Sequence, residues 1–519
     1  MRGIGQDVAV VGLGVLGLVT VKNLAEEGFN VTGFDRNGYV GGLWHFSPGD
    51  QVSILPTTVV NISKERVCYT DFPFPKETPS YCSAVQVEQY MEDYADHFNL
   101  RPRLRLNTTV TKVRRDEKAN KWILDIEGSD PQIFDRVVMA TGIQGTPHIP
   151  KIPGMELFAG NNVHSRAFKD PAAFKGKRVV VVGLANTGAD TIDALCPHAK
   201  EVYISHGHGS IVFPRIGANG KPFDHSFSSR KLATSGFLAA NFPKLHEFLM
   251  NSMLKKMQGE FFQMKPEWRL SPAPSIVHAI PVVSDNLVQN FTDGKVTSIP
   301  RISKVLGPTT LELEDGSKVE ADSIVWCTGY QSDFRLIDAL ADPTRNTTPR
   351  WAAAKGSKGK PLPRLYQNVI SEDYPDSLAF MGGVAFLTGV FSLYDLASMA
   401  VAQIWKGSST LPSKQEMNHA IDKHHEHMCT IAEQGPVIPG WVEGSQWLDW
   451  ANRMAGTGVA EHLGWGAEGW KFWMNDRELC SLLMDGLLSP HMYRLFDGKR
   501  KKWDGARAEI YRVNGKSTN

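Results

Sequence analysis

The sequence predicts an α/β fold that contains two dinucleotide-binding units of the Rossmann type. Two stretches carry this prediction, residues 8–44 and 178–205, because each places an apolar strand directly before a glycine turn and a helix. Each unit is followed by another apolar strand that ends in Thr-Gly, at Thr141-Gly142 and at Thr328-Gly329. One architecture repeated about 170 residues apart indicates two nucleotide cofactors in one chain.

The first unit has the residues that hold a diphosphate at a helix N-terminus. Its turn reads Gly12-Leu13-Gly14-Val15-Leu16-Gly17, and its second strand ends at Asp35. Gly12 permits the tight turn, Gly14 lets the backbone approach a pyrophosphate, and Gly17 lets the helix pack closely on the strand. Asp35 is placed to accept hydrogen bonds from ribose hydroxyls.

Composition limits the class of protein. A chain of 519 residues can bury a large core and favours about two to four domains. The net charge is +1, so the chain has no large excess of positive charge that would indicate a nucleic acid or an anionic membrane as partner. Six scattered cysteines without a CxxC pair indicate a reduced intracellular chain. We see no signal peptide or membrane span, and we expect a cytoplasmic protein.

Outside the two units, the apolar pattern predicts further regular elements. Residues 85–98 have a helical period, 104–113 and 122–126 alternate like strands, and 137–140 form a buried strand. Residues 309–319 predict a hairpin, and 391–405 predict a buried helix. Ser413 and Glu416 form a capping box that starts another helix. The histidines of that helix lack a standard zinc spacing, so no metal site is expected.

The segment 207–272 is irregular and contains one clear helical pattern. Leu245, Leu249, Met253 and Met257 are spaced by four residues, so they share one face of a helix. We expect this face to cover the core. A lid or a membrane-touching segment is the alternative, because an exposed apolar row marks an interaction surface.

Several motifs in order resemble one family, the flavin-containing monooxygenases, which are class B flavoprotein monooxygenases with two dinucleotide domains. The most specific motif runs from Phe158 through Gly160 and His164 to Phe168, and matches the pattern FxGxxxH followed by an aromatic residue. Others are Asn61-Ile62-Ser63-Lys64-Glu65, Gly41-Gly42-Leu43-Trp44, and segments 71–75, 327–330 and 490–507. The resemblance covers roughly residues 8 to 510.

The resemblance implies FAD in the first unit and NADPH in the second. It implies an FAD domain in two parts, 1–170 and 331–519, the second including a helical C-terminal region. An NAD(P)H domain, 171–330, lies between them, with the irregular insertion at about 207–272 as a lid. The implied cofactor-binding residues are Gly12, Gly14, Val15, Leu16, Gly17, Asp35, Gly42, Leu43, Trp44, Asn61, Val110, Thr141, Gly142, Gly183, Asn186, Thr187, Gly188, Asp190, His206, Thr328 and Gly329.

The implied reaction uses NADPH and O₂. Hydride passes to FAD, reduced flavin forms a C4a-hydroperoxyflavin, and this oxygenates a soft nitrogen or sulfur atom of a small molecule. Asn61 is the implied catalytic residue, because its amide both donates and accepts hydrogen bonds. Baeyer–Villiger oxidation of a ketone stays open, although Phe168 and Asn61 speak against it. An NAD(P)H oxidase that releases H₂O₂ stays open, as does a flavin-binding sensor without turnover.

Three departures from the family pattern bear on these expectations. Ala185 replaces the middle glycine of the second turn. An alanine methyl group can be tolerated there, and we expect it to shift the pyrophosphate. Ser205-His206-Gly207-His208 stands where the family often has an arginine for the 2′-phosphate of NADPH. Either another cation, such as Arg215, binds the 2′-phosphate in place of that arginine, or NADH is also accepted as the reductant. We predict reduced discrimination between NADPH and NADH. The animal-type C-terminal membrane helix is missing, so no transmembrane anchor is expected; a homo-oligomer stays open.

Overall fold

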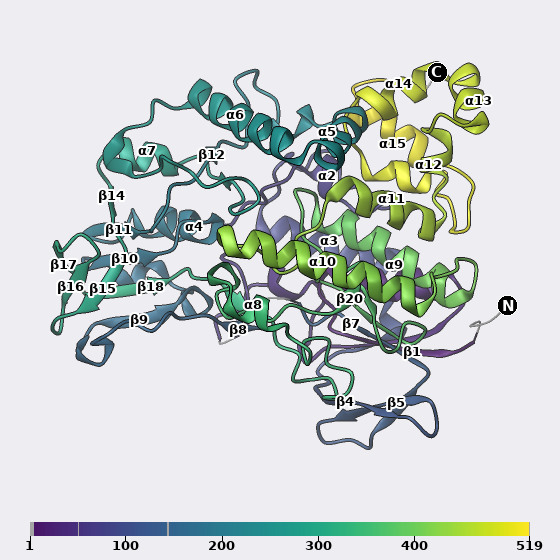
Figure 1. The fold of residues 1–519 in the computed structure, drawn as a ribbon, viewed down its shortest axis with the longest axis horizontal. Coiled ribbons are helices and arrows are strands. Elements are labelled where there is room, and N and C mark those ends of the chain that lie inside the picture. Colours follow the sequence, from purple (N-terminus) through teal and green to yellow (C-terminus); the bar gives the residue numbers. More distant parts are fainter. Residues whose placement is uncertain (1–4, 50, 143–144, 518–519) are drawn as a thin grey trace.

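Two sheets built mainly of parallel strands form the centre of the fold (Figure 1). The computed structural model describes residues 5–49, 51–142 and 145–517. The first sheet contains β1 (Asp7–Val11), β2 (Asn30–Phe34), β3 (Leu104–Arg105), β7 (Arg136–Met139), β20 (Leu365–Tyr366), β21 (Ile370–Ser371) and β22 (Leu378–Phe380). Its order is β20-β21-β22-β7-β1-β2-β3. The strands from β22 to β3 run parallel, and β20 and β21 form an antiparallel edge.

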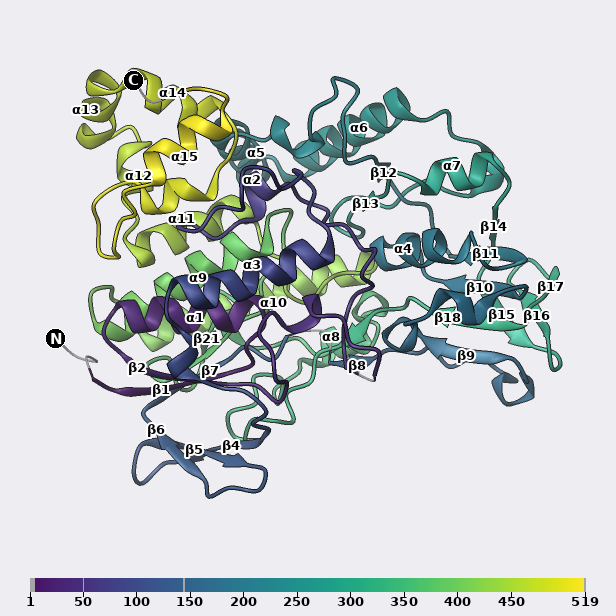
Figure 2. The ribbon, with the colours of Figure 1, turned by 180° about the vertical axis from the view of Figure 1, so that it is seen from behind.

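Helices cover one face of this sheet, and a small antiparallel sheet covers the other (Figure 2). The helices are α1 (Val15–Glu26), α3 (Ala84–His97) and α9 (Val390–Lys406); the small sheet comprises β4 (Val110–Asp116), β5 (Lys121–Ile126) and β6 (Gln132–Phe134). Side chains of β1 alternate between the two layers. Val8 and Val10 pack with the helices, and Ala9 and Val11 pack with β4 and β5, as the period of two in a strand requires.

The second sheet repeats the three-layer arrangement. It contains β9 (Asn161–His164), β10 (Arg178–Val182), β11 (Glu201–Ser205), β14 (Val296–Ile299) and β18 (Ser323–Trp326), in the order β14-β11-β10-β18-β9. All its neighbouring strands are parallel. Helices α4 (Asn186–Leu195) and α7 (Leu287–Thr292) pack on one face; β15 (Ile302–Val305), β16 (Thr310–Leu313) and β17 (Lys318–Glu320) pack on the other. The predicted α/β class with two such units is therefore confirmed.

Two short strands cross between the sheets. β8 (Thr146–Pro147) pairs antiparallel with β19 (Tyr330–Gln331). Because β8 lies shortly after Thr141-Gly142 and β19 directly follows Thr328-Gly329, this pairing brings both Thr-Gly turns to one junction. β9 precedes residue 171 but belongs to the second sheet, so the chain enters that sheet before β10.

The local patterns predicted most of the remaining elements. The helix expected at 85–98 is α3, and the hairpin at 309–319 is β16 and β17. The strand expected at 104–113 is divided into β3 and β4, because Asn107 takes a positive φ of 51° between them. The Ser413 capping box is present and starts α10 (Lys414–Gln434).

The segment 207–272 differs from the expectation. It forms two consecutive helices, α5 (Ser229–Asn241) and α6 (Pro243–Phe261), beside short strands β12 (Val212–Phe213) and β13 (Val282–Val283). The expected burial of this face of α6 is wrong for three of its four residues: Leu245, Leu249 and Met253 are 45–49% exposed, and Met257 is half-buried. The helix instead buries Leu254 and Gln258. The spacing of apolar residues predicts that a segment is helical, but it does not predict whether other elements pack against that face of the helix.

The C-terminal region is helical and packs beside α9 and α5 (Figure 1). After α10 it contains α11 (Gly444–Ala455), α12 (Val459–His462), α13 (Ala467–Asn475), α14 (Arg477–Asp485) and α15 (Ala506–Val513). The other short helices are α2 (Lys64–Val67) and α8 (Pro349–Ala353). Within the described residues, every helix is too short or too polar to span a lipid bilayer.

Candidate functional site

The first glycine turn joins the carboxyl end of β1 to α1. Gly12 has φ +97°, and a Cβ atom there would lie 2.5 Å from the Ala140 carbonyl oxygen. A Cβ atom on Gly17 would overlap the Gly12 carbonyl oxygen. The close helix–strand contact therefore excludes side chains at both positions.

A second glycine segment faces this turn. The 3₁₀ turn Gly42–Trp44 lies beside the start of α1, and a Cβ atom on Gly42 would be 3.0 Å from Gly14 Cα. Among the described residues, no side chain caps α1, whose N-cap is Gly14. The backbone amides of its first turn are therefore available to an anion, as a cofactor diphosphate requires. Trp44 packs edge-on against Phe391 at the start of α9, with ring centroids 6.1 Å apart.

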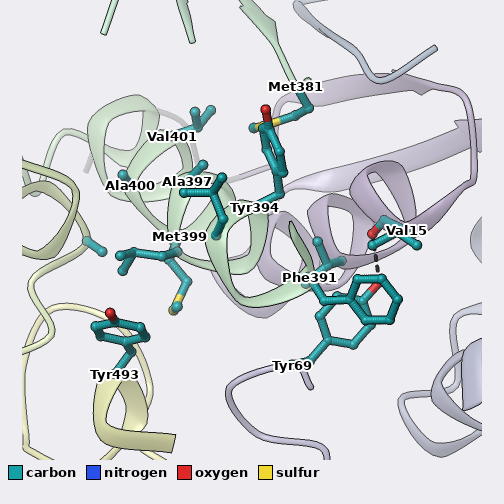
Figure 3. Close-up of a cluster of buried hydrophobic side chains, with 14 of the residues drawn as sticks. Val15, Tyr69, Met381, Phe391, Tyr394, Ala397, Met399, Ala400, Val401 and Tyr493 are labelled. Carbon is teal, nitrogen blue, oxygen red and sulfur yellow. Dashed lines mark hydrogen bonds between the residues drawn. The ribbon is translucent and has the colours of Figure 1, made fainter. Parts of the chain in front are cut away.

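Aromatic side chains pack against the start of α1 and hold it in place. The Tyr69 hydroxyl donates a hydrogen bond to the Val15 carbonyl at 2.6 Å, and its ring lies against Phe391 (Figure 3). The Leu16 carbonyl accepts a hydrogen bond from the Thr20 hydroxyl at 2.7 Å. The carbonyl oxygens of Val15 and Leu16 thus accept hydrogen bonds from other protein groups. A ligand at this turn would contact the backbone amides of these two residues, and that contact stays a prediction. Leu43 accepts from the Ile54 amide at 3.0 Å, which holds the 3₁₀ turn to the following loop.

The Asp35 carboxylate makes two structural hydrogen bonds, and its contact with a ribose stays a prediction. Its Oδ2 accepts from the Leu13 amide at 2.7 Å, and its Oδ1 accepts from the Asn37 amide at 2.9 Å. The carboxylate thus stabilises the glycine turn itself. The Asp35 carbonyl also accepts from Thr108 at 2.8 Å, which brings the start of β4 close to it. Val110, at that start, is 8% exposed and packs in the core, and its contact with a cofactor stays a prediction.

The second glycine turn has the same geometry between β10 and α4. Gly183 has φ +107°, and a Cβ atom there would lie 2.5 Å from the Cys327 carbonyl oxygen. A Cβ atom on Gly188 would overlap the Gly183 carbonyl oxygen. Ala185 is the exposed N-cap of α4 with φ −140°, so its methyl group causes no backbone strain. The departure at the middle glycine is therefore compatible with the turn.

The residues after this turn have different surroundings. Asn186 accepts from the Val283 amide at 2.9 Å, which ties α4 to β13. Thr187 is exposed at the start of the helix and accessible to a ligand. Burial raises the pKa of Asp190 to about 6, opposed by the positive charge of Arg215. The contact of Asp190 with a cofactor stays a prediction.

His164 connects β9 to the second Thr-Gly turn. Its Nδ1 accepts from the Arg166 amide at 3.1 Å, so its Nε2 carries the hydrogen and donates to the Gly329 carbonyl at 3.0 Å. Burial lowers the pKa of His164, which keeps this neutral tautomer. Thr328 donates from its hydroxyl to the His148 carbonyl. The histidine of the FxGxxxH motif thus positions the Gly329 turn, whereas Thr141 and Gly142 are exposed at the first turn.

Asn61 is held by an arginine from the inserted segment. Arg215 Nη2 donates to Asn61 Oδ1 at 3.1 Å and to the Val59 carbonyl at 2.9 Å, and Nε donates to the Val60 carbonyl at 2.9 Å. Nη1 donates to Asp285 at 2.8 Å. Arg215 is 8% exposed, so these bonds form in a water-poor environment.

Asp224 makes a second connection between the two segments. It accepts from the Ser63 amide at 2.8 Å and from the Tyr81 hydroxyl at 3.2 Å. His225 lies 3.3 Å from Glu65 in the same loop. Sequence reasoning did not single out Asp224 or Asp285, because their partners are far away in the chain and they stand in segments without a periodic pattern.

His206 is enclosed by its own chain. It is 5% exposed, with Nδ1 2.8 Å from the His208 carbonyl and Nε2 2.8 Å from the Ser298 hydroxyl. Burial lowers its pKa, so the ring is neutral at pH 7. Arg215, the alternative cation for a 2′-phosphate, has its donors directed to the Asn61 loop and Asp285. The direct contact of His206 with a cofactor stays a prediction.

Comparisons with known proteins agree with this architecture. A family model described as flavin-binding monooxygenase-like matches residues 5–518. Monooxygenase aurF of Gibberella zeae is 46% identical over 512 residues, which cover 98% of this chain and 97% of that protein.

Solved structures share the fold. The S-allyl-L-cysteine S-oxygenase from Allium sativum has a TM-score of 0.63 at 19% identity, with 92% of this chain and 94% of that one covered. The NADP⁺-bound cyclohexanone monooxygenase from Rhodococcus sp. Phi1 has a TM-score of 0.64 at 18% identity, with 88% and 98% covered. One fold therefore occurs in enzymes named for sulfur oxygenation and for a ketone.

Proposed function

The chain belongs to the flavin-binding monooxygenase-like family and is an FAD- and NADPH-dependent monooxygenase; from that premise we propose that it oxygenates a soft nitrogen or sulfur atom of a small molecule. FAD, when bound, supplies the redox chemistry by accepting a hydride from NADPH and activating O₂. The protein supplies binding, orientation and exclusion of water. The residues described above fit this division of roles.

The glycine turns fit two dinucleotides. Gly14 and Gly42 leave a backbone cradle at the uncapped start of α1, which would hold the FAD diphosphate. Gly183 and Thr187 at the start of α4 would hold the NADPH diphosphate, because α4 also has no side-chain cap within the described chain. These assignments of single residues are part of the proposal.

Asn61 is the group proposed to act on the reacting oxygen. Since Arg215 donates to Oδ1, the Asn61 Nδ2 hydrogens are directed elsewhere and remain to donate. A fixed amide donor stabilises developing charge without reorganisation during the reaction. The connections through Arg215 and Asp224 tie the inserted segment to this loop, in which Asn61 is half-buried. A segment held in this way would limit the access of water to the Asn61 amide.

The pairing of Arg215 supports the proposed preference for nitrogen or sulfur. Oxygen transfer to a lone pair uses an electrophilic oxygen, whereas oxidation of a ketone begins with attack by an anionic oxygen that a cation stabilises. The Arg215 guanidinium is a cation that contacts Asn61, and Asp285 pairs with it at 2.8 Å. Its Nε and Nη2 also donate to carbonyl and amide oxygens. This arrangement favours the heteroatom reaction.

Product analysis tests the proposal. Purified holoenzyme is incubated with NADPH, O₂ and one of three probes: a tertiary amine, a thioether or a cyclic ketone. We expect N-oxide or sulfoxide to account for most of the NADPH consumed with at least one heteroatom probe. A lactone from the ketone alone would establish the Baeyer–Villiger alternative. Stoichiometric H₂O₂ with every probe would establish the oxidase alternative.

A further inference from the structure

The loop that follows the carboxyl end of β11 has a glycine, Gly207, at its second position, so no side chain extends from that position. In a dinucleotide-binding unit, the 2′ position of the adenine ribose lies at the end of the second strand. Here that strand is β11, and it is followed by His206 and the exposed Gly207. His206 is buried, neutral and hydrogen-bonded on both ring nitrogens. The loop after β11 therefore contributes no arginine or lysine of its own.

The side chain of Arg301 lies where a side chain of residue 207 would extend. Arg301 stands between β14 and β15, and β14 pairs with β11 up to the level of Ser205. A Cβ atom added to Gly207 would overlap the Arg301 Nε, Cζ and Nη2 atoms. The guanidinium thus lies directly over Gly207, where a side chain of the β11 loop would begin. The Ser205 hydroxyl, which donates to the Pro300 carbonyl at 2.9 Å, holds the two strand ends together.

Arg301 is accessible to a ligand. Its side chain is 57% exposed, and its ion pair with Glu314 is long, at 3.8 Å, with Glu314 52% exposed. An exposed pair of this length is weak, so a phosphate can compete with the carboxylate.

We infer that Arg301 supplies the positive charge that recognises the 2′-phosphate of NADPH, through a guanidinium placed over Gly207. This deepens the cofactor use established by family membership and does not depend on which atom is oxygenated. The fork of donors suits a phosphate dianion, and Gly207 is required because any side chain there would displace it. A single exposed arginine gives moderate selection for NADPH over NADH, about 10- to 100-fold.

Calorimetric titration of the FAD-bound enzyme with 2′,5′-ADP and with 5′-AMP tests the inference without turnover. We expect wild type to bind 2′,5′-ADP at least about tenfold more tightly than 5′-AMP. Arg301→Ala should remove that difference by weakening 2′,5′-ADP alone, and Arg301→Lys should retain part of it. Gly207→Ala should also weaken 2′,5′-ADP, although it removes no charge.

Arg453→Ala is the matched control. Arg453 is also 57% exposed and pairs with a 52% exposed carboxylate, Asp449, but it stands on α11. It should leave both affinities unchanged. Equal affinity of wild type for the two nucleotides, or a difference that persists in Arg301→Ala, would overturn the inference. The visible flavin spectrum of each variant shows that it is folded and loaded.

Discussion

Asn61 is oriented by a guanidinium that lies 154 positions away in the chain. The bond between them joins a loop of the first unit to the segment inserted in the second. Arg215 is a positioning residue in this proposal, because its contacts are with Asn61, Asp285 and backbone carbonyls. Its effect on the reaction should therefore pass through the Asn61 amide.

A double-mutant cycle tests this connection. Asn61→Ala removes the proposed donor, so the rate of substrate oxygenation should fall roughly 100-fold and NADPH oxidation should end in H₂O₂. Arg215→Lys should raise H₂O₂ release in the same way, with little change in KM for NADPH. The double variant should be about as defective as Asn61→Ala alone, because both changes remove one interaction. Peroxide and NADPH are measured together.

The exposed Asn241 on α5 provides the control for this cycle. Asn241→Ala removes an amide that bonds only within its own helix, to the Phe237 carbonyl at 2.9 Å among the contacts described. It should leave the coupling of NADPH oxidation to oxygenation unchanged. Fully additive effects of the Asn61 and Arg215 substitutions would show that Arg215 does not act through Asn61.

Asp190 gives the protein a defined pH dependence. Burial raises its pKa from 3.8 to about 6, so the folded protein binds a proton more tightly than the unfolded chain. This group therefore lowers stability as pH rises from about 4 to about 6, by up to about 3 kcal/mol. Asp190→Asn removes the effect. Its thermal midpoint should match wild type near pH 4 and exceed it near pH 7, without nucleotide. A constant difference across this range would contradict the assignment.

At the scale of elements, a network of charged side chains around Arg494 connects the C-terminal region to α1. Arg494 is 1% exposed and donates to Glu26 at 2.7 Å and to Asn23 at 2.6 Å. It also lies 3.5 Å from Asp71, which forms an ion pair with Lys22. Buried carboxylates require these partners, because an unpaired charge in the interior is costly.

Removing this arginine should destabilise the whole fold. Arg494→Met keeps the volume but leaves Glu26 and Asp71 with fewer partners, so the free energy of unfolding should fall by roughly 3–5 kcal/mol. Urea denaturation of the holoenzyme measures it. Arg453→Met, at an exposed position on α11, should change it by less than about 0.5 kcal/mol. Equal effects of the two substitutions would show that the network contributes no stability.

The helix α6 shows how far an element can be interpreted from its own pattern. The spacing of Leu245, Leu249 and Met253 predicted a helix correctly, yet this face is exposed. The opposite case is α9, whose mostly apolar sequence predicted a buried helix. Every residue from Phe391 to Trp405 is buried, including the polar Asp395 and Gln403. Periodicity is a property of the segment, whereas coverage depends on which neighbours pack beside it.

At the scale of the molecule, the two sheets have the same three layers and place their glycine turns toward one junction. The antiparallel pair of β8 and β19 brings the two Thr-Gly turns together there. The inserted segment then crosses to the Asn61 loop through Arg215 and Asp224. The two proposed cofactor sites and the position of the Asn61 loop thus depend on one repeated architecture and one connection between its copies.

The sequence by itself determined the two glycine turns, the strands before them and the family motifs. These are local features, because Gly12 and Gly183 are demanded by the backbone conformation of a few consecutive residues. Only the tertiary structure decided the partners of Arg215, the enclosure of His206 and the position of Arg301 over Gly207. Those contacts join residues far apart in the chain. Side-chain hydrogen bonds and burial depend on how the elements pack, and no local pattern in the sequence records that packing.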